Sequence, residues 1–410
     1  MEDANTHYPR VLKATLLDDL KLYPAVAVMG ARQVGKSTLC LELAKELGFA
    51  NRTLDDSDVR ERALSDPEGL LAELGDSGAF IDEVQRAPDL LLALKAVIDR
   101  EQRPGRYLLS GSNQPRMGGA VGDSLLGRAA YRTLRPLTLS ELRFDEYHRG
   151  WSFLFNVDDD AVLEELGRRA ISSGELDWRE IVRTGGFPRA LAAPADQRIR
   201  LLEDYVEVFS GRDIRDLITL ESGSRFDDFV RLIGARSAQE LNASGIASDL
   251  GIPVSTIRRW LDALRRSYLV EVVPAYSRNP GSRLIKAPKL FVVDTAFALA
   301  AAGEELPTGF HLETLVASDM FVWRDSGPSR RVYHWRKTTG PEVDLVIEEH
   351  GQLVGVEVKS TSSIGISDAR HLRTLREMYP QTVRGLVLSC DREIRLVGSN
   401  VVACPWWAVL

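Results

Sequence analysis

A glycine-rich octapeptide near the start of the chain has the residue types and the spacing that hold a phosphate chain. It fits the pattern GxxxxGK[ST] in full. In such a loop the glycines let main-chain N–H groups curl round a β-phosphate, the lysine neutralises the β- and γ-phosphates, and the serine hydroxyl ligates Mg²⁺. ATP and Mg²⁺ are therefore the predicted cofactors. The predicted nucleotide-binding residues are Gly30, Ala31, Arg32, Gln33, Val34, Gly35, Lys36, Ser37 and Thr38, with Ser37 also as a metal ligand.

Two carboxylates close a second apolar run. Asp82 and Glu83 follow residues 79–81, which predict a buried strand. Asp82 would hold Mg²⁺ through water, and Glu83 would polarise the water that attacks the γ-phosphate. Asn113, or equally Ser112, follows a third apolar run and is a candidate to orient that water, although polar residues after a strand also simply form turns. Together these residues predict an ATP-hydrolysing enzyme.

One arginine is a candidate partner of the γ-phosphate. Arg128 ends the sequence Leu126-Gly127-Arg128. An arginine that reaches a transferring phosphoryl group stabilises its charge, either from within the chain or from a neighbouring subunit. A plain surface arginine is the alternative, because the chain is rich in this residue.

An α/β layer fold is needed to position these groups. The clearest buried strands, over residues 25–29, 79–81 and 107–109, alternate with amphipathic helical stretches. After residue 143 the pattern is mostly helical up to residue 232. A helix-turn-helix then fits residues 241–267, with its turn at Gly251 and a wing strand after it. Further strands are expected over residues 290–293, 343–347, 353–359 and 385–388.

The bulk composition indicates a folded, cytoplasmic protein of several domains. A chain of 410 residues, 44% hydrophobic and 27% charged, is too long for one core and average for a globular protein. The formal charge of −7 excludes a uniformly positive surface, so a nucleic-acid surface would have to be local. Three scattered cysteines argue against a disulfide framework and a cysteine-based zinc site. No signal peptide and no run of about 18 apolar residues is present, which predicts no membrane contact.

Seven motifs in one order resemble those of bacterial and archaeal AAA-type ATP-binding proteins that join a P-loop domain to a C-terminal domain of unknown function. They occupy residues 30–38, 80–83, 109–113, 126–128, 185–188, 288–294 and 342–345. The resemblance implies an α/β chain with an AAA+-like ATPase domain (1–143), a helical lid or connector (144–232), a winged helix (233–287) and a domain similar to the PD-(D/E)XK nucleases (288–410). It leaves open whether such proteins cut nucleic acid.

A second set of charged residues suits a nuclease centre. Glu357 and Lys359 alternate with valines, so both point to one face of a strand, and Asp344 lies on the preceding strand of a hairpin. Asp344 and Glu357 would bind Mg²⁺, and Lys359 would orient a water or stabilise charge on phosphorus. Glu313, on a helix before the hairpin, is the additional carboxylate that the nuclease fold often has. The alternative is an edge hairpin that carries solvated charge.

A local surplus of positive charge between residues 255 and 289, which includes Lys286 and Lys289, predicts a DNA-facing surface. Arg258, Arg259, Arg265 and Arg266 lie on or next to the second helix of the helix-turn-helix, where a winged helix touches DNA. A domain interface is the alternative, since winged helices also mediate protein contacts.

The combined prediction is an ATPase whose nucleotide state controls a nuclease-like domain that acts on, or binds, DNA. One alternative is an ATP-dependent switch in a defence, stress or toxin–antitoxin setting, with a non-catalytic C-terminal module that binds a protein partner. A DNA-binding regulator that uses only the winged helix is another. A homo-oligomer is compatible with each of these functions.

Overall fold

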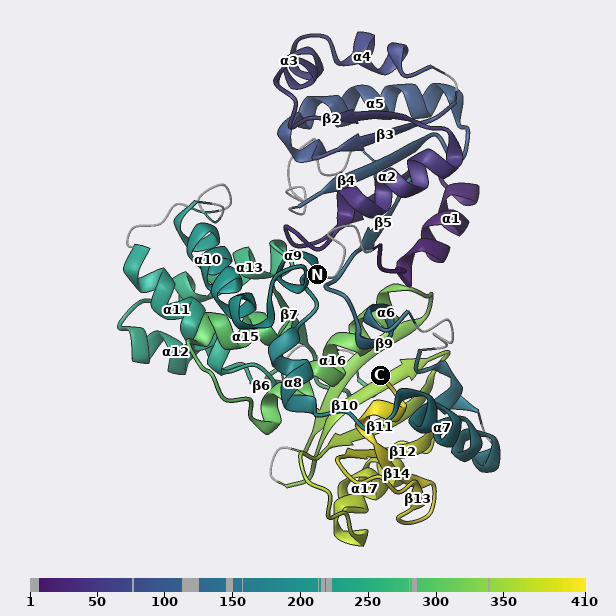
Figure 1. Cartoon of the computed structure of the whole chain (residues 1–410), viewed down its shortest axis with the longest axis vertical. Coiled ribbons are helices and arrows are strands. Elements are labelled where there is room, and N and C mark those ends of the chain that lie inside the picture. The colour runs from purple at the N-terminus through teal and green to yellow at the C-terminus, as the bar shows by residue number, and fades with distance from the viewer. Residues whose placement is uncertain are drawn as a thin grey trace. The chain divides into compact units, whose positions relative to one another are not determined.

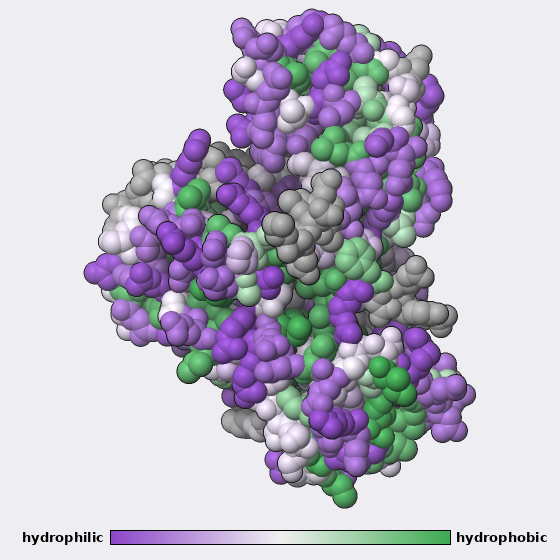
Figure 2. Space-filling model, in the orientation of Figure 1, coloured by the Kyte–Doolittle hydropathy of each residue, from purple (hydrophilic) through white to green (hydrophobic). Residues whose placement is uncertain are grey.

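The computed structural model describes residues 7–75, 77–112, 125–144, 150–156, 158–212, 214, 218, 223–279, 281, 286–337 and 340–410. The chain forms two compact units, one of residues 7–137 with 266–268 and one of residues 138–265 with 269–410 (Figure 1). Hydrophilic and hydrophobic residues are interspersed on the face of each unit that Figure 2 shows. Within the described residues, no helix has both the length and the apolar character needed to cross a membrane.

The smaller unit is built on a parallel sheet with the strand order β2-β3-β4-β1-β5. Every residue of the central strands β1, β3 and β4 is buried, which matches their apolar sequences. The strands are β1 (Ala25–Met29), β2 (Ala50–Thr53), β3 (Ala79–Asp82), β4 (Tyr107–Gly111) and β5 (Ala129–Thr133).

Helices cover both faces of this sheet. One face packs on α3, α4 and α5 and forms a continuous apolar core with them. Helix α2 contacts β1, β3 and β4, and α1 contacts β1. The helices are α1 (Leu12–Leu22), α2 (Lys36–Leu47), α3 (Ser57–Ser65), α4 (Pro67–Glu73), the 3₁₀ turn η1 (Val84–Arg86) and α5 (Pro88–Glu101).

The larger unit begins with helices and a small antiparallel sheet of order β6-β8-β7. Helix α15 packs on α10 and α11, and α12 contacts α11. The elements are α6 (Leu139–Leu142), η2 (Ser152–Phe155), α7 (Asp159–Ser173), α8 (Trp178–Thr184), α9 (Pro188–Leu191), η3 (Ala195–Gln197), α10 (Arg198–Gly211), α11 (Gly223–Ala235), β6 (Gln239–Glu240), α12 (Ala243–Leu250), α13 (Val254–Arg266), β7 (Val270–Val273), β8 (Lys289–Val292) and α15 (Thr295–Ala302).

A six-stranded mixed sheet of order β13-β14-β12-β11-β10-β9 completes the larger unit. Strands β9, β10 and β11 are antiparallel, and β11 crosses over through α17 to the parallel strand β12. The elements are α16 (Gly309–Asp325), β9 (Arg330–Arg336), β10 (Glu342–Glu349), β11 (Gln352–Val358), η5 (Ile366–Ala369), α17 (Arg370–Met378), β12 (Thr382–Ser389), β13 (Arg395–Leu396), β14 (Val401–Pro405) and η6 (Trp406–Ala408).

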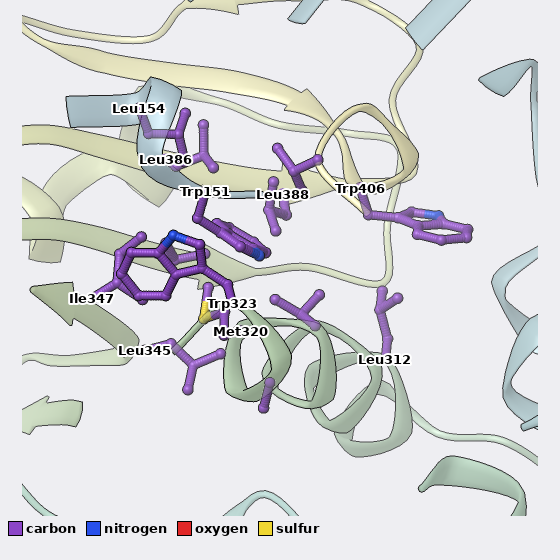
Figure 3. Close-up of a cluster of buried hydrophobic side chains, with 14 of the residues drawn as sticks. Trp151, Leu154, Leu312, Met320, Trp323, Leu345, Ile347, Leu386, Leu388 and Trp406 are labelled. Atoms are coloured by element: carbon purple, nitrogen blue, oxygen red, sulfur yellow. The ribbon is translucent and has the colours of Figure 1, made fainter. Parts of the chain in front are cut away.

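The main core of this unit lies between α16 and the six-stranded sheet, and tryptophans pack among its aliphatic side chains (Figure 3). Trp151 and Trp323 are buried, and each indole N–H has a partner: Trp151 donates to Asp319 Oδ1 (2.8 Å) and Trp323 to Ser152 Oγ (2.9 Å). These pairings let the rings of Trp151 and Trp323 fill the core with their donors satisfied, whereas the buried Nε1 of Trp406 has no hydrogen-bond partner among the described residues. The two pairings also fix α16, which carries Glu313.

Most of the elements predicted from apolar runs are confirmed. The runs over residues 25–29, 79–81 and 107–109 are β1, β3 and β4, and the two helices either side of Gly251 are α12 and α13. Gly251 itself has a φ of 64°, the left-handed geometry of a helix C-terminus. Strand β8 lies beyond the boundary expected at residue 287 but pairs with β6 and β7 rather than with the six-stranded sheet.

Candidate functional site

The glycine-rich loop joins the carboxyl end of β1 to the first residue of α2. Gly30 has a φ of 154° and Gly35 a φ of 95°, and Gln33 also adopts a positive φ. A Cβ on Gly30 would lie 2.2 Å from the carbonyl oxygen of Leu134, so only glycine fits there. The loop therefore presents main-chain N–H groups at a helix N-terminus, which is an arrangement suited to a phosphate group.

Lys36 is the first residue of α2, and its side chain reaches back to the start of this loop. Its ammonium donates to the carbonyl oxygens of Gly30 (3.0 Å) and Ala31 (2.8 Å). The side chain is only 4% exposed, and burial lowers the pKa of Lys36, although Glu83 and Asp82 oppose part of that fall. A buried cation that contacts only carbonyl groups fits an anionic ligand, because a phosphate would compensate its charge.

Carboxylates gather at the same edge of the sheet. Strand β4 lies between β1 and β3, so the carboxyl ends of all three strands meet there. Asp82, the last residue of β3, accepts a hydrogen bond from the Ser110 hydroxyl of β4. This neutral donor orients Asp82 without cancelling its charge, which suits a carboxylate that is to bind a metal.

Glu83 is held by two neutral side chains. It adopts the left-handed conformation (φ 58°), and Gln85 Nε2 donates to its Oε2 and also to Ser112 Oγ (3.0 Å). Ser112 Oγ lies 3.5 Å from the same Glu83 oxygen. Gln85 Oε1 is buried and has no hydrogen-bond partner among the described residues. Gln85 therefore fixes the Glu83 carboxylate to the end of β4.

A second buried cluster lies in the larger unit, around Lys289. Its ammonium donates to Glu313 Oε1 at 2.8 Å and to Asp344 Oδ1 at 3.4 Å. Burial lowers the pKa of Lys289, but the two carboxylates raise it by more. Burial and the neighbouring Asp344 raise the pKa of Glu313. The three side chains come from β8, α16 and β10, so the fold brings together residues that are distant in sequence.

Glu357, on β11, and Lys359, which directly follows β11, flank this cluster. Lys359 Nζ donates to Glu357 Oε2 at 2.9 Å, and the Val358 amide donates to Asp344 Oδ2 at 2.9 Å. Glu357 Oε1 is buried and accepts no hydrogen bond among the described residues; His371 Nδ1 lies 3.9 Å from it. The structure therefore brings together the Glu313, Asp344, Glu357 and Lys359 that the sequence selected.

Helix α13 separates its residues by face. Ile257, Trp260 and Leu264 are buried, and Trp260 packs against Phe226 and Phe229 at ring distances of 5.3 and 5.4 Å. Arg258, Arg259 and Arg265 are exposed, whereas Arg266 is half-buried. No ion pair within the described part of the chain involves the three exposed arginines, so their charge faces solvent.

Comparison with known proteins agrees with the geometry of the smaller unit. Residues 22–143 match the sequence model of the family described as AAA domain. Residues 22–143 form an AAA-type P-loop ATPase domain. Its two signature elements, the glycine-rich loop and the carboxylates after β3, both lie within the matched range.

The rest of the chain matches families without an assigned function. Residues 308–409 match Domain of unknown function (DUF4143), and residues 175–308 match Domain of unknown function (DUF8612). "Uncharacterized protein Rv2008c" of Mycobacterium tuberculosis and "Uncharacterized protein Mb2031c" of Mycobacterium bovis are each 28% identical to this chain over 355 residues, which is 84% of this chain and 72% of the relative.

Solved structures show weaker likeness. The Walker-type ATPase PABY2304 of Pyrococcus abyssi is 19% identical, with a TM-score of 0.39 over 70% of this chain and 94% of that one. The RuvB Holliday junction branch migration motor of Thermotoga maritima is 19% identical, with a TM-score of 0.29 over 72% of this chain and 92% of that one. Both TM-scores lie below 0.5, which is too weak a likeness to group the chain with either protein.

Arg128 lies at the opposite edge of the ATPase domain from the loop. It precedes β5, and its carbonyl oxygen accepts from the amide of Ala25, the first residue of β1, at 3.3 Å. Strand β1 spans about 16 Å between that point and the loop. The Arg128 guanidinium pairs with Asp99. Arg128 therefore does not face the phosphate site of its own chain. This corrects the prediction that Arg128 could contact the γ-phosphate from within the chain. Asn113 lies outside the described residues.

Three residues that sequence reasoning did not assign to a site belong to these clusters. Arg10 donates to the carbonyl oxygen of Val34 (2.8 Å) and so anchors the glycine-rich loop. No sequence pattern marked Gln85 as a site residue, apart from its position two residues after Glu83. Lys289 was counted with the basic surface, although a lone charge at the head of an apolar run is a sign of a buried ion pair.

Proposed function

We propose that this chain binds ATP with Mg²⁺ and hydrolyses it. The observation that carries the proposal is the meeting, at one edge of the β1–β4–β3 sheet, of the glycine-rich loop with Asp82 and Glu83. In a parallel sheet this edge is where ligands bind. The match to the AAA domain family supports the same conclusion.

The residues fit their ligands by chemistry and by shape. The amides of residues 30–38 would bind the phosphates, and Lys36 would exchange its two carbonyl partners for phosphate oxygens. Ser37 and Asp82 would hold Mg²⁺, which neutralises charge on the phosphates when bound. Glu83, fixed by Gln85, would accept the proton of the attacking water. Arg128 would act, if at all, on the nucleotide of a neighbouring subunit.

The test is ATP turnover in the presence of Mg²⁺. Glu83→Gln should lower kcat by about 100-fold or more while ATP binding persists, because only the general base is lost. Lys45→Ala, which changes an exposed lysine of the same helix α2, is the matched control and should leave both unchanged. Equal turnover by the wild type and Glu83→Gln would contradict the proposal.

We further propose that the nucleotide state controls a nuclease-like C-terminal domain that acts on or binds DNA. Support comes from Asp344 and Glu357 on adjacent strands with Lys359 directly after β11, and from the buried Glu357 Oε1, which accepts no hydrogen bond among the described residues. The exposed arginines of α13 add to it, because they suit a winged helix that touches phosphates. In the arrangement described here a divalent cation does not fit the centre, because the Lys289 ammonium already contacts Glu313 and Asp344.

This second proposal is tested by incubating the protein with single- and double-stranded DNA, Mg²⁺ and ATP. Cleavage that disappears in both Glu357→Ala and Lys36→Ala supports a nucleotide-controlled nuclease. If DNA stays intact under every condition but salt-sensitive binding is lost in Arg258→Ala/Arg259→Ala, the chain is a DNA-binding regulator instead. If neither cutting nor binding occurs, an ATP-dependent switch with a protein partner replaces both.

A further inference from the structure

Lys289 enters the C-terminal carboxylate centre from a different sheet. Its strand, β8, is the middle strand of the three-stranded sheet and pairs with both β6 and β7. The centre itself stands on β10 and β11 of the six-stranded sheet and on α16. Lys289 therefore brings a positive charge from the three-stranded sheet to a centre formed by the six-stranded sheet and α16.

The Lys289 ammonium takes up the oxygens that a metal would need. It contacts Glu313 Oε1 (2.8 Å), Asp344 Oδ1 (3.4 Å) and the main-chain oxygen of Asp344 (3.5 Å). The side chain is 8% exposed, so the ammonium has left bulk water for these oxygens. Among the described residues, no three His, Cys, Asp or Glu side chains are grouped in a way that would hold a metal ion.

The local fold keeps this ammonium in place. Strand β10 bulges at Asp344, where two residues of β10 stand opposite one residue of β9. The bulge and the Val358 amide together fix the direction of the Asp344 carboxylate. Strand β8 is tied to α16, because the hydroxyl of Ser318 donates to the carbonyl oxygen of Val293 (3.1 Å). Both partners of Lys289 are thus presented to it by fixed elements.

A divalent cation and a lysine ammonium compete for the same oxygens. Mg²⁺ and Mn²⁺ bind carboxylate oxygens directly. A metal ion on the oxygens that the Lys289 ammonium contacts would lie so close to the ammonium that the two positive charges would repel each other. We propose that Lys289 is a built-in counter-ion that excludes divalent cations from the Glu313–Asp344–Glu357 centre, so that metal enters only after the Lys289 side chain has left. This inference rests on the proposed nuclease-like role of the centre and adds to it how the centre is kept closed.

The test is Mn²⁺ binding by calorimetry to the full-length protein with the P-loop blocked by Lys36→Ala in every sample. Lys289→Met should bind Mn²⁺ at least about tenfold more tightly than the parent, because the competing charge is gone. Adding Glu357→Ala to Lys289→Met should remove this gain, whereas Lys337→Met, which changes an exposed lysine, should give none. Equal Mn²⁺ affinity of the parent and Lys289→Met, whether tight or absent, would overturn the inference.

A second variant covers the case in which Lys289→Met does not fold. Lys289→Gln/Glu313→Gln removes both charges of the pair and keeps Asp344 and Glu357, so it should fold and gain a Mn²⁺-dependent rise in melting temperature that the parent lacks. A double variant without that rise would also overturn the inference. DNA that stays intact while Lys289→Met gains Mn²⁺ would remove the nuclease role and leave the exclusion by Lys289 standing.

Discussion

Two buried lysines, one in each unit, show opposite electrostatic environments at nearly equal burial. Lys36 is 4% exposed and Lys289 is 6% exposed. Burial lowers the pKa of Lys36, which contacts only carbonyl groups, whereas at Lys289 two carboxylates outweigh burial and raise the pKa. Among the described residues Lys36 donates only to carbonyl oxygens, with Asp82 and Glu83 acting on it from a distance, whereas Lys289 contacts two carboxylates directly.

The carboxylates of the two sites differ in the same way. In the ATPase domain Asp82 and Glu83 are held by the neutral side chains of Ser110 and Gln85. In the larger unit Asp344 and Glu357 are each held by a lysine as well. The first arrangement keeps negative charge available for a metal, and the second has already neutralised it. This difference in charge balance agrees with the two proposals, that the first site is open to ATP and Mg²⁺ and that Lys289 keeps the second closed to metal.

The largest effect is expected at Lys289. Lys289→Met leaves Glu313 and Asp344 buried without their cation, so the larger unit should lose about 3–5 kcal/mol of stability. All seven tryptophans lie within residues 151–407, so tryptophan fluorescence during denaturation follows this unit alone. Lys337→Met is the control, and a variant as stable as the control would mean that the pair contributes little.

Removing the Lys36 side chain should leave stability unchanged but weaken ligand binding, the reverse of what is expected at Lys289. Lys36→Met eliminates a buried charge whose burial outweighs the attraction of Asp82 and Glu83, so the nucleotide-free ATPase domain should not lose stability. ATP affinity should nevertheless fall by roughly 100-fold, since charge-assisted hydrogen bonds to phosphate are lost. Calorimetry with ATP and Mg²⁺ measures the affinity, and circular dichroism follows unfolding. If Lys36→Met lost much stability but bound ATP with unchanged affinity, the two lysines would not differ in the way described.

The sequence predicted those parts of both sites that depend on local patterns. The loop at residues 30–38 and the strands β1, β3 and β4 have unbroken motifs and apolar runs, and alternation along residues 353–359 correctly placed Glu357 beside Lys359. Strands β2 and β9 were missed because they carry polar residues and lack such a run. Lys289 was misplaced because its partners, Glu313 and Asp344, meet it only through tertiary structure.

A smaller effect is expected when one anion of Lys289 is neutralised. Glu313→Gln keeps the shape of the side chain but leaves Lys289 with Asp344 alone, which should cost about 2 kcal/mol in the same fluorescence assay. The loss should shrink when the change is made in the Lys289→Met background, because the two residues act as a pair. Additive losses in the double variant would show that Glu313 is stabilised by something other than Lys289.

The smallest effect concerns Gln85, the neutral holder of Glu83. Gln85→Ala should lower kcat roughly tenfold, because the Glu83 carboxylate is no longer held at one position relative to Ser112. The KM for ATP should stay the same, since Gln85 makes no hydrogen bond to the glycine-rich loop within the described residues. Gln85→Lys sharpens the comparison further: it places a cation beside Glu83, as Lys359 lies beside Glu357, and should lower kcat more than the alanine does. A rise in KM at constant kcat in either variant would mean that Gln85 supports nucleotide binding and does not position Glu83.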